Sequence, residues 1–215
     1  MPNKQPSNET DKIKVDYIAK RCIHSRKCVL GLPNVFKPGV KGGWILAENA
    51  DVEELVDVIK SCPSGALTFE RLDNGRVETH NSIPTVRLWE NGPIEIRADI
   101  SMSDDATKSR ALLCRCGKSK NKPYCDNSHI DADFKATADP KSLKGEAVED
   151  LLGKPLNIAE APNGPIILEG PVEIIASSGR SLAKHTKTAL CRCGASKNKP
   201  YCDGSHAKID FNTAS

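Results

Sequence analysis

A stretch of sixteen residues occurs twice in the chain with the same cysteines and histidine. CRCGKSKNKPYCDNSH covers residues 114–129, CRCGASKNKPYCDGSH covers 191–206, and fourteen of the sixteen positions are identical. Thiolate and imidazole are ligands for zinc and for iron, so the pattern C-x-C-x8-C-x3-H predicts two copies of a metal site. The candidate ligands are Cys114, Cys116, Cys125 and His129 in the first block, and Cys191, Cys193, Cys202 and His206 in the second.

The grouping of all nine cysteines supports this interpretation. Three more cysteines, Cys22, Cys28 and Cys62, form a third group near the N-terminus. Each group therefore holds an odd number of thiols, which favours metal ligands over disulfide pairs.

The metal in the repeated block is either iron in a cluster or a structural zinc ion. Three thiolates and one imidazole also describe a Cys3His zinc site, but zinc sites usually use C-x2–4-C spacing. The C-x-C spacing favours a cluster, with Gly117 and Gly194 permitting the tight turn. Asp126 or Asp203 stands where a helix N-cap is expected, and the histidine falls in the first helical turn. There the partial positive charge of a helix N-terminus favours an anionic centre.

The second block matches the CDGSH-type iron–sulfur motif, C-x-C-x2-S/T-x3-P-x-C-D-G-S/T/A-H, at every defined position. The first block departs from it at Asn127, where the family has Gly. Asn tolerates positive φ better than most residues, so we expect a functional site there too. The resemblance covers about 85–135 and 160–213. It implies a [2Fe–2S] cluster in each block, held by three Cys and one His as in mitoNEET-like proteins.

The N-terminal cysteines lie in RCIHSRKC and in CPSG. A single-cluster ferredoxin has C-x2-C-x2-C followed downstream by C-P, and here Ser25 stands at the middle cysteine position. Residues 15–72 resemble the divergent ferredoxin-like single-cluster domain found fused to CDGSH modules. The resemblance implies a cluster held by Cys22, Cys28 and Cys62.

The missing fourth cysteine leaves the type of this cluster open. Three thiolates suit a [3Fe–4S] cluster, whereas a [4Fe–4S] cluster would need Ser25, His24 or water as its fourth ligand. The alternative is a ferredoxin-like fold that keeps its cysteines without binding iron. We interpret His24 by itself as a surface loop histidine.

The rest of the sequence predicts an α+β organisation. It comprises a disordered polar leader (1–14), a small ferredoxin-like domain (15–73) and two tandem β-rich CDGSH modules (85–135 and 160–213), joined by the polar segment 135–154. Each module begins with an Asn-Gly-Pro turn followed by a strand-like segment, PIEIRADISM or PIILEGPVEIIA.

In the first domain, apolar residues spaced i, i+3, i+4, i+7 predict a helix. Asn49 or Asp51 can cap its start, and Pro63 is expected to end it just after Cys62. The segment ALTFERLDNGRVET then predicts a hairpin with Asn74-Gly75 at its turn. The four apolar residues are Val52, Leu55, Val56 and Ile59.

Composition narrows the class of protein. In 215 residues only 4% are aromatic and 38% hydrophobic, which favours small units held together by metals or disulfides. The net charge of +3 comes from dispersed lysines, whereas nucleic-acid binding calls for a dense basic stripe. The polar N-terminus and the lack of an apolar run of about 18 residues argue against a secretion signal or a membrane span. We expect a reducing, cytoplasmic setting.

The function that uses all nine cysteines is a soluble multi-cluster iron–sulfur protein that carries electrons or passes clusters to other proteins. Its partner would be a redox protein or a cluster acceptor. With two blocks in one chain, we expect a monomer whose repeats form an intramolecular pseudo-dimer. A zinc-stabilised interaction module without a redox role is the alternative. We expect no enzymatic activity, since the sequence contains no nucleophile–base pattern and no phosphate-binding glycine loop.

The histidine ligands generate a first prediction. Three thiolates and a neutral imidazole bring an oxidised [2Fe–2S] core to a charge of about −1, against about −2 with four thiolates. Imidazole can be protonated where a bound thiolate resists it, so we predict acid-labile clusters whose reduction takes up a proton. Replacing His129 and His206 in turn by Cys should slow the loss of visible absorbance at acid pH. Unchanged lability would exclude this role for the histidines.

Overall fold

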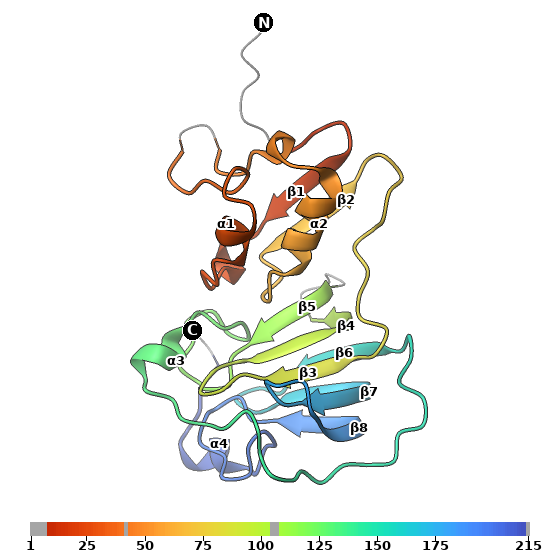
Figure 1. The fold of residues 1–215 in the computed structure, drawn as a ribbon. Helices are drawn as coiled ribbons and strands as arrows, with labels where there is room; N and C mark the ends of the chain where they lie inside the picture. The colour runs from red at the N-terminus through yellow and green to blue at the C-terminus, as the bar shows by residue number, and fades with distance from the viewer. Residues whose placement is uncertain (1–7, 41–42, 104–107, 214–215) are drawn as a thin grey trace, which may run out of the picture. The chain divides into compact units, whose positions relative to one another are not determined.

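The computed structural model of the chain describes residues 8–40, 43–103 and 108–213. The chain divides after Thr79 into two compact units, which are mostly β with a few short helices (Figure 1). Among the described residues, no helix combines the length and apolar character needed to cross a membrane.

The first unit is a two-stranded antiparallel sheet with two short helices beside it. Its strands pair so that Ile13 lies opposite Arg71 and Tyr17 opposite Leu67. Ile13 and Val15 point to the same side and are buried, as expected from the two-residue period of a strand. The elements are β1 (Ile13–Tyr17), η1 (Ala19–Arg21), α1 (Lys27–Gly31), η2 (Ala47–Asn49), α2 (Val52–Lys60) and β2 (Leu67–Arg71).

Strand β1 corrects the expected leader of residues 1–14. The strand begins at Ile13, whose side chain belongs to the buried core, and Glu9 forms an isolated bridge with Lys14. The apolar Ile13 and Val15 draw this part of the chain into the core, so the first unit starts upstream of residue 15. Residues 1–7 of the expected leader lie outside the described residues.

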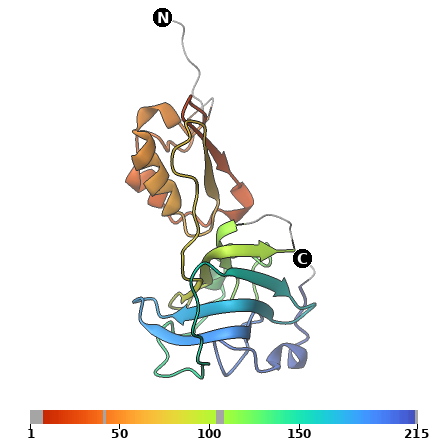
Figure 2. The ribbon, with the colours of Figure 1, turned by 90° about the vertical axis from the view of Figure 1, so that its right-hand side faces the viewer.

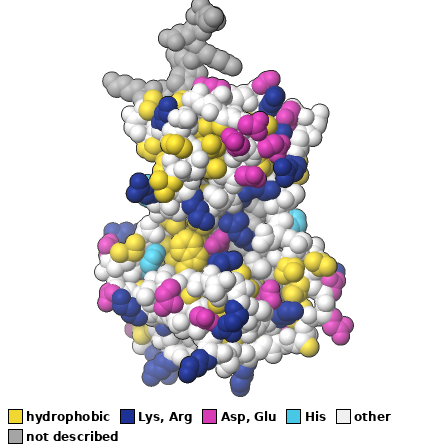
Figure 3. Space-filling view, viewed as in Figure 1, with side chains coloured by type: hydrophobic (Ala, Val, Ile, Leu, Met, Phe, Trp, Pro, Cys, Tyr) yellow, Lys and Arg dark blue, Asp and Glu magenta, His cyan; other side chains and the backbone are white. Residues whose placement is uncertain are grey.

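Helix α2 confirms the helix expected from the apolar spacing. Asp51 is the N-cap, and its carboxylate accepts a hydrogen bond of 2.8 Å from the amide of Glu53. Leu55 and two neighbours on the same face are fully buried. The helix ends at Lys60, two residues before the expected end at Cys62. Acidic side chains gather over α2 on the face shown in Figure 3.

The prediction of a hairpin over residues 66–79 is wrong. Asn74 does adopt the left-handed conformation of a turn, with φ of 58°, but residues 75–84 form no strand, and β2 pairs with β1 instead. The side chain of Asp73 accepts hydrogen bonds from Arg71 and from the amide of Gly75. Arg71 also binds Glu53 of α2, so this turn is fastened to the helix rather than continued as a strand.

The second unit consists of two copies of one arrangement, three strands followed by a short helix. In each copy the first two strands form an antiparallel hairpin across the Asn-Gly-Pro turn, where Asn91 and Asn163 have positive φ values of 50° and 48°. The first copy has β3 (Thr85–Leu88), β4 (Ile94–Met102), β5 (Lys108–Leu113) and α3 (Ser128–Asp131), and the second has β6 (Pro155–Glu160), β7 (Ile166–Ile175), β8 (Ser181–Leu190) and α4 (Ser205–Lys208).

The two copies exchange strand pairings and form one six-stranded sheet. The first half of β4 pairs with β3 of its own copy, and its second half pairs in parallel with β6 of the other. Strand β7 does the same in the second copy: its first half pairs with β6 of its own copy, and its second half pairs in parallel with β3 of the first. Figures 1 and 2 show these strands side by side. Apolar side chains from both copies consequently share one buried core.

The copies also touch at the glycines of their C-x-C turns. Gly117 has φ of 78° and Gly194 has φ of 81°, a region that glycine enters without strain. A Cβ at Gly117 would fall against the carbonyl oxygen of Cys193, and one at Gly194 against that of Cys116. Each turn therefore lies directly on the backbone of the other, and glycine is required for contact as well as for conformation.

This contact predicts the cost of an added methyl group. Gly117→Ala should lower the free energy of unfolding by about 3 kcal/mol, combining left-handed strain with overpacking against backbone. Gly153→Ala is the matched control, because Gly153 also has positive φ, 64°, but has open space around it; its cost should be about 1 kcal/mol. Denaturant unfolding at equal metal content measures both, and equal losses would contradict the proposed contact.

Candidate metal centres

Each repeated block starts where a strand ends and folds back beside it. The amide of Cys114 donates to the carbonyl of Pro123 at 2.8 Å, and the amide of Cys125 donates to that of Leu112 at 2.9 Å. The second block has the same two bonds, from Cys191 and from Cys202. The strand thus fixes the C-x-C turn, and the returning chain brings the third cysteine next to it.

The four expected ligands of each block lie in two pairs. In the first block the Cys114 and Cys116 sulfurs are 3.6 Å apart, and the Cys125 sulfur is 3.6 Å from Nδ1 of His129. The corresponding distances in the second block are 3.8 Å and 3.4 Å. Two ligands about 2.0–2.3 Å from one tetrahedral metal lie roughly 3.5–3.8 Å apart. Each pair therefore has the spacing of two ligands on a single metal ion.

The other defined positions of the motif hold the loop in shape. Ser119 donates to the carbonyl of Tyr124 at 2.6 Å, and its hydroxyl accepts from the amide of Asn121. Asp126 accepts from the amides of Lys120 and Ser128 at 2.8 and 3.0 Å. Ser196 and Asp203 make the same bonds in the second block.

The start of each short helix differs from expectation by one residue. The N-cap is Asn127 in α3 and Gly204 in α4, both left-handed with φ of 72° and 82°. The preceding aspartate, expected to be the N-cap, still accepts the amide bond from the first helical residue. Asn127 therefore adopts the conformation of the family glycine, as the sequence led us to expect.

Burial and hydrogen bonding shift the pKa values of the candidate ligands. Backbone amides point at the sulfurs, with the Asn127 amide 3.4 Å from Cys125. Burial raises the pKa of Cys125 to about 12. A hydrogen bond from the Cys116 thiol lowers the pKa of Cys114 to about 6. Burial lowers the pKa of His129, which favours the neutral imidazole that a metal requires.

The residue between the two cysteines of each C-x-C turn is a buried arginine, which the sequence analysis did not single out. Arg115 donates to the carbonyls of Trp89 and Gly92 at 2.6 and 2.9 Å. Arg192 donates to the carbonyls of Ala161 and Gly164 at 2.6 and 3.0 Å. Each arginine thereby fastens its cysteine turn to the Asn-Gly-Pro hairpin of the same copy. The sequence signal that could have found them is that both repeated blocks have arginine at this position.

The same arginines place positive charge beside the opposite copy. Burial lowers the pKa of Arg115 to about 10, which still leaves it charged at neutral pH. Its charge interacts with Cys191, and that of Arg192 interacts with Cys114. The two arginines differ in their acidic partners: Arg192 is paired directly with the carboxylate of Glu160 at 2.6 Å, whereas Arg115 interacts with the charge of Glu90. Both ligand sets therefore lie in a field set by the two cations.

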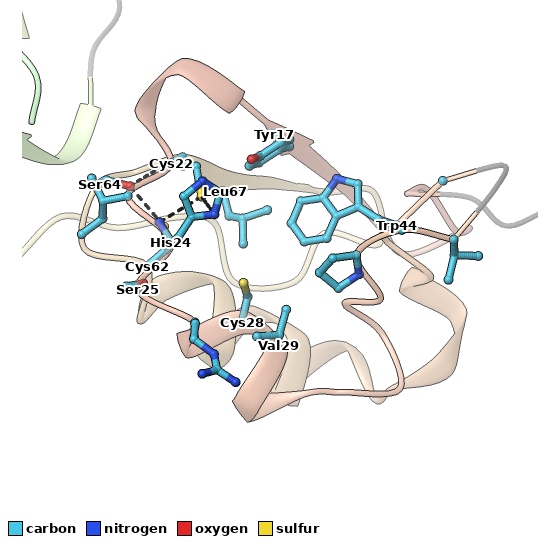
Figure 4. A pocket seen from close by; sticks show the side chains of 17 residues that line it. Tyr17, Cys22, His24, Ser25, Cys28, Val29, Trp44, Cys62, Ser64 and Leu67 are labelled. Atoms are coloured by element: carbon cyan, nitrogen blue, oxygen red, sulfur yellow. Dashed lines mark hydrogen bonds between the residues drawn. The ribbon is translucent and has the colours of Figure 1, made fainter. Parts of the chain in front are cut away.

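The N-terminal cysteines come together in the first unit, around a cavity of about 780 Å³ (Figure 4). Cys22 follows η1, Cys28 lies within α1, and Cys62 follows α2. Apolar and aromatic side chains, including Trp44, form much of the wall. Three thiols facing one largely apolar cavity fit the binding of an inorganic cluster.

Two hydroxyl groups at this cavity were not recognised from the sequence. Burial and a hydrogen bond with Cys22 raise the pKa of Tyr17 to about 12, so the phenol stays protonated. Ser64 is buried, with its oxygen 3.6 Å from the sulfur of Cys62.

Across the described parts of the chain, no three His, Cys, Asp or Glu side chains are grouped to hold one metal ion.

Comparison with known proteins identifies both units. The family model "Iron-binding zinc finger CDGSH type" matches residues 91–130 and 163–207. The model "Divergent 4Fe-4S mono-cluster" matches residues 9–71. The "Uncharacterized protein YjdI" of Escherichia coli, in strain K12 and in O157:H7, is 41% identical over 59 residues. That alignment spans 27% of this chain and 76% of the relative.

Both ligand blocks thus lie within the residues that the CDGSH model matches, and the three cysteines of the cavity lie within those that the mono-cluster model matches. The chain belongs to the CDGSH iron-binding family and carries, ahead of its two CDGSH segments, a divergent 4Fe-4S mono-cluster domain.

Proposed function

We propose that the protein carries electrons between iron–sulfur clusters and a redox partner protein, and has no catalytic activity of its own. Each CDGSH block would hold a [2Fe–2S] cluster through its three cysteines and one histidine, and the N-terminal cysteines would hold a third cluster. A reducing compartment such as the cytoplasm suits this role, since free thiols persist there. The observation that carries the proposal is the pairing of the ligands in each block.

The pairing supports a cluster with two irons rather than a single zinc ion. A [2Fe–2S] cluster has two metals, each with two protein ligands. The distances of 3.6 and 3.6 Å in the first block, and 3.8 and 3.4 Å in the second, divide the ligands in that way. The cysteine pair would bind one iron, and the Cys–His pair would bind the other.

We further propose that the two copies form a pseudo-dimer within one chain, so that no second chain is needed. The exchange of strand pairings between β3–β4 and β6–β7 supports this arrangement. The contact of Gly117 with Cys193, and of Gly194 with Cys116, brings the two ligand sets next to each other. Two neighbouring redox centres suit the transfer of electrons, which depends on short distances.

When bound, each cluster supplies a one-electron redox couple, and the chain's own residues set its environment. Backbone amides that point at the sulfurs stabilise negative charge there, as does the charge of Arg115 and Arg192. Burial of the cysteine turns excludes water from that side. The Cys–His pair of the second block is more exposed, with Cys202 and His206 only half-buried.

Substitution of one cysteine in each block tests the cluster assignment. Cys125→Ser and Cys202→Ser should each remove the iron, the sulfide and the visible absorbance of one block, and the double variant should remove both. His80→Ala is the control, because this exposed histidine belongs to no ligand set. Protein purified without oxygen is analysed for iron, zinc and sulfide. Colourless wild-type protein with zinc in both blocks would disprove the proposal.

The pairing of Arg192 with Glu160 gives a second test. Glu160→Gln removes a carboxylate 2.6 Å from the guanidinium and leaves its charge uncompensated beside both ligand sets. The midpoint potentials of the CDGSH clusters should rise, by an energy on the order of 1 kcal/mol or roughly 40 mV for one electron. Potentiometric titration followed by visible absorbance measures the change.

Glu169→Gln is the matched control for that experiment. Glu169 also pairs with a cation at 2.6 Å, Lys187, but both side chains are exposed. Solvent screens exposed charges, so this variant should keep the wild-type potentials. Equal shifts in both variants would show that the buried pair has no special influence on the clusters.

A further inference from the structure

The N-terminal cavity has three thiols for a cluster that takes four protein ligands. A [4Fe–4S] cluster binds one ligand at each iron, and Cys22, Cys28 and Cys62 account for three. Three other side chains that line the cavity and could bind iron lie within two or three residues of these cysteines. They are His24, Ser25 and Ser64.

Like Ser64 at Cys62, His24 lies beside a proposed ligand, Cys22. Its Nδ1 lies 4.0 Å from the sulfur of Cys22, and its own amide donates to that sulfur at 3.4 Å. Figure 4 shows the imidazole beside Cys22 within the cavity. The imidazole thus lies at the part of the cavity wall that Cys22 forms.

The backbone around His24 is held in an uncommon conformation. His24 has φ of 52° and Arg26 has φ of 62°, and a left-handed conformation costs a residue with a Cβ about 1 kcal/mol or more. Such strain gathers at functional sites, where it serves to aim a group. Here the left-handed residues lie in the loop that places the His24 imidazole beside Cys22.

The two serines fit the position less well. Ser64 is buried, accepts a hydrogen bond from the amide of Ala66 at 3.3 Å and faces Cys62, so its hydroxyl is placed to contact that sulfur. Ser25 occupies the place of the missing ferredoxin cysteine, but among the described contacts none joins its hydroxyl to a sulfur. A serine must also lose a proton of high pKa to bind iron, whereas neutral imidazole binds at pH 7.

We infer that His24 is the fourth protein ligand of a [4Fe–4S] cluster in the N-terminal unit. The inference rests on the proposed function, in which the three cysteines hold a cluster there. All three centres of the chain would then use one donor set, three thiolates and one imidazole. His24 is exposed in a loop, as the sequence led us to expect, and the proposed role would use it from that position.

Electron paramagnetic resonance of the full chain tests the inference. Oxidised [2Fe–2S] and [4Fe–4S] clusters give no signal, whereas an oxidised [3Fe–4S] cluster is paramagnetic. Oxidised wild-type protein, prepared without oxygen, should therefore be silent. With a mild one-electron oxidant added to both samples, His24→Ala should lose one iron per chain as Fe2+ and show an oxidised [3Fe–4S] signal approaching one spin per chain, with the CDGSH clusters unchanged.

Two further variants separate a ligand from a structural residue. His24→Cys should keep the four-iron cluster and remain silent when oxidised, but with a lower midpoint potential because a thiolate adds negative charge. Ser25→Ala, changed at the neighbouring position, should behave as wild type. A [3Fe–4S] signal in Ser25→Ala but not in His24→Ala would assign the ligand to Ser25 and overturn the inference.

The remaining outcomes distinguish this inference from the proposed function. A His24→Ala variant that keeps all its iron and stays silent would overturn the role of His24 alone. So would wild-type protein with a full [3Fe–4S] signal, or with only two irons in the N-terminal unit. Wild-type protein with iron in the CDGSH blocks but none at the N-terminus would overturn this inference and the third cluster together. Protein without iron anywhere would overturn the proposed function itself.

Discussion

The direct contact between two glycine turns constrains the whole second unit. Gly117 and Gly194 lie on the backbones of Cys193 and Cys116, where no larger residue fits. That contact requires the strands leading into the two turns to approach each other, which the crossed pairings of β3 and β6 accomplish. One copy alone would leave the second half of β4 or of β7 paired along one edge only, with β5 or β8, and unpaired backbone groups are costly when buried. The duplication is therefore part of the fold itself.

In the proposed function the two neighbouring ligand sets would hold anionic centres, which repel each other. The arginine between the paired cysteines of each block offsets this repulsion. Arg115 and Arg192 are buried and charged, and each interacts with a cysteine of the other copy. A buried cation is costly unless its hydrogen bonds are satisfied. Carbonyls of the Asn-Gly-Pro hairpins supply those bonds, so the same contacts hold the turn and keep the charge inside.

The N-terminal unit assembles a related set of donors by another route. Its cysteines come from a loop, a short helix and the end of a longer helix, and they face a cavity lined by aromatic and apolar side chains. Tyr17 and Ser64 contribute hydroxyls at the sulfurs. In the CDGSH blocks, by contrast, backbone amides of one continuous loop supply those contacts. The chain thus joins two ways of stabilising thiolate ligands.

The sequence by itself determined which residues could bind metal, because thiolate and imidazole chemistry depends on residue type and the spacing repeats. It also determined helix α2, whose apolar period and Asp51 cap are local features, and the left-handed conformation at Asn127. The tertiary structure decided what local pattern cannot encode. It paired β2 with β1 instead of with the residues after Asn74, and it set each buried arginine beside the other copy. Those outcomes depend on which distant segments share a core, a free-energy balance that no short stretch of sequence contains.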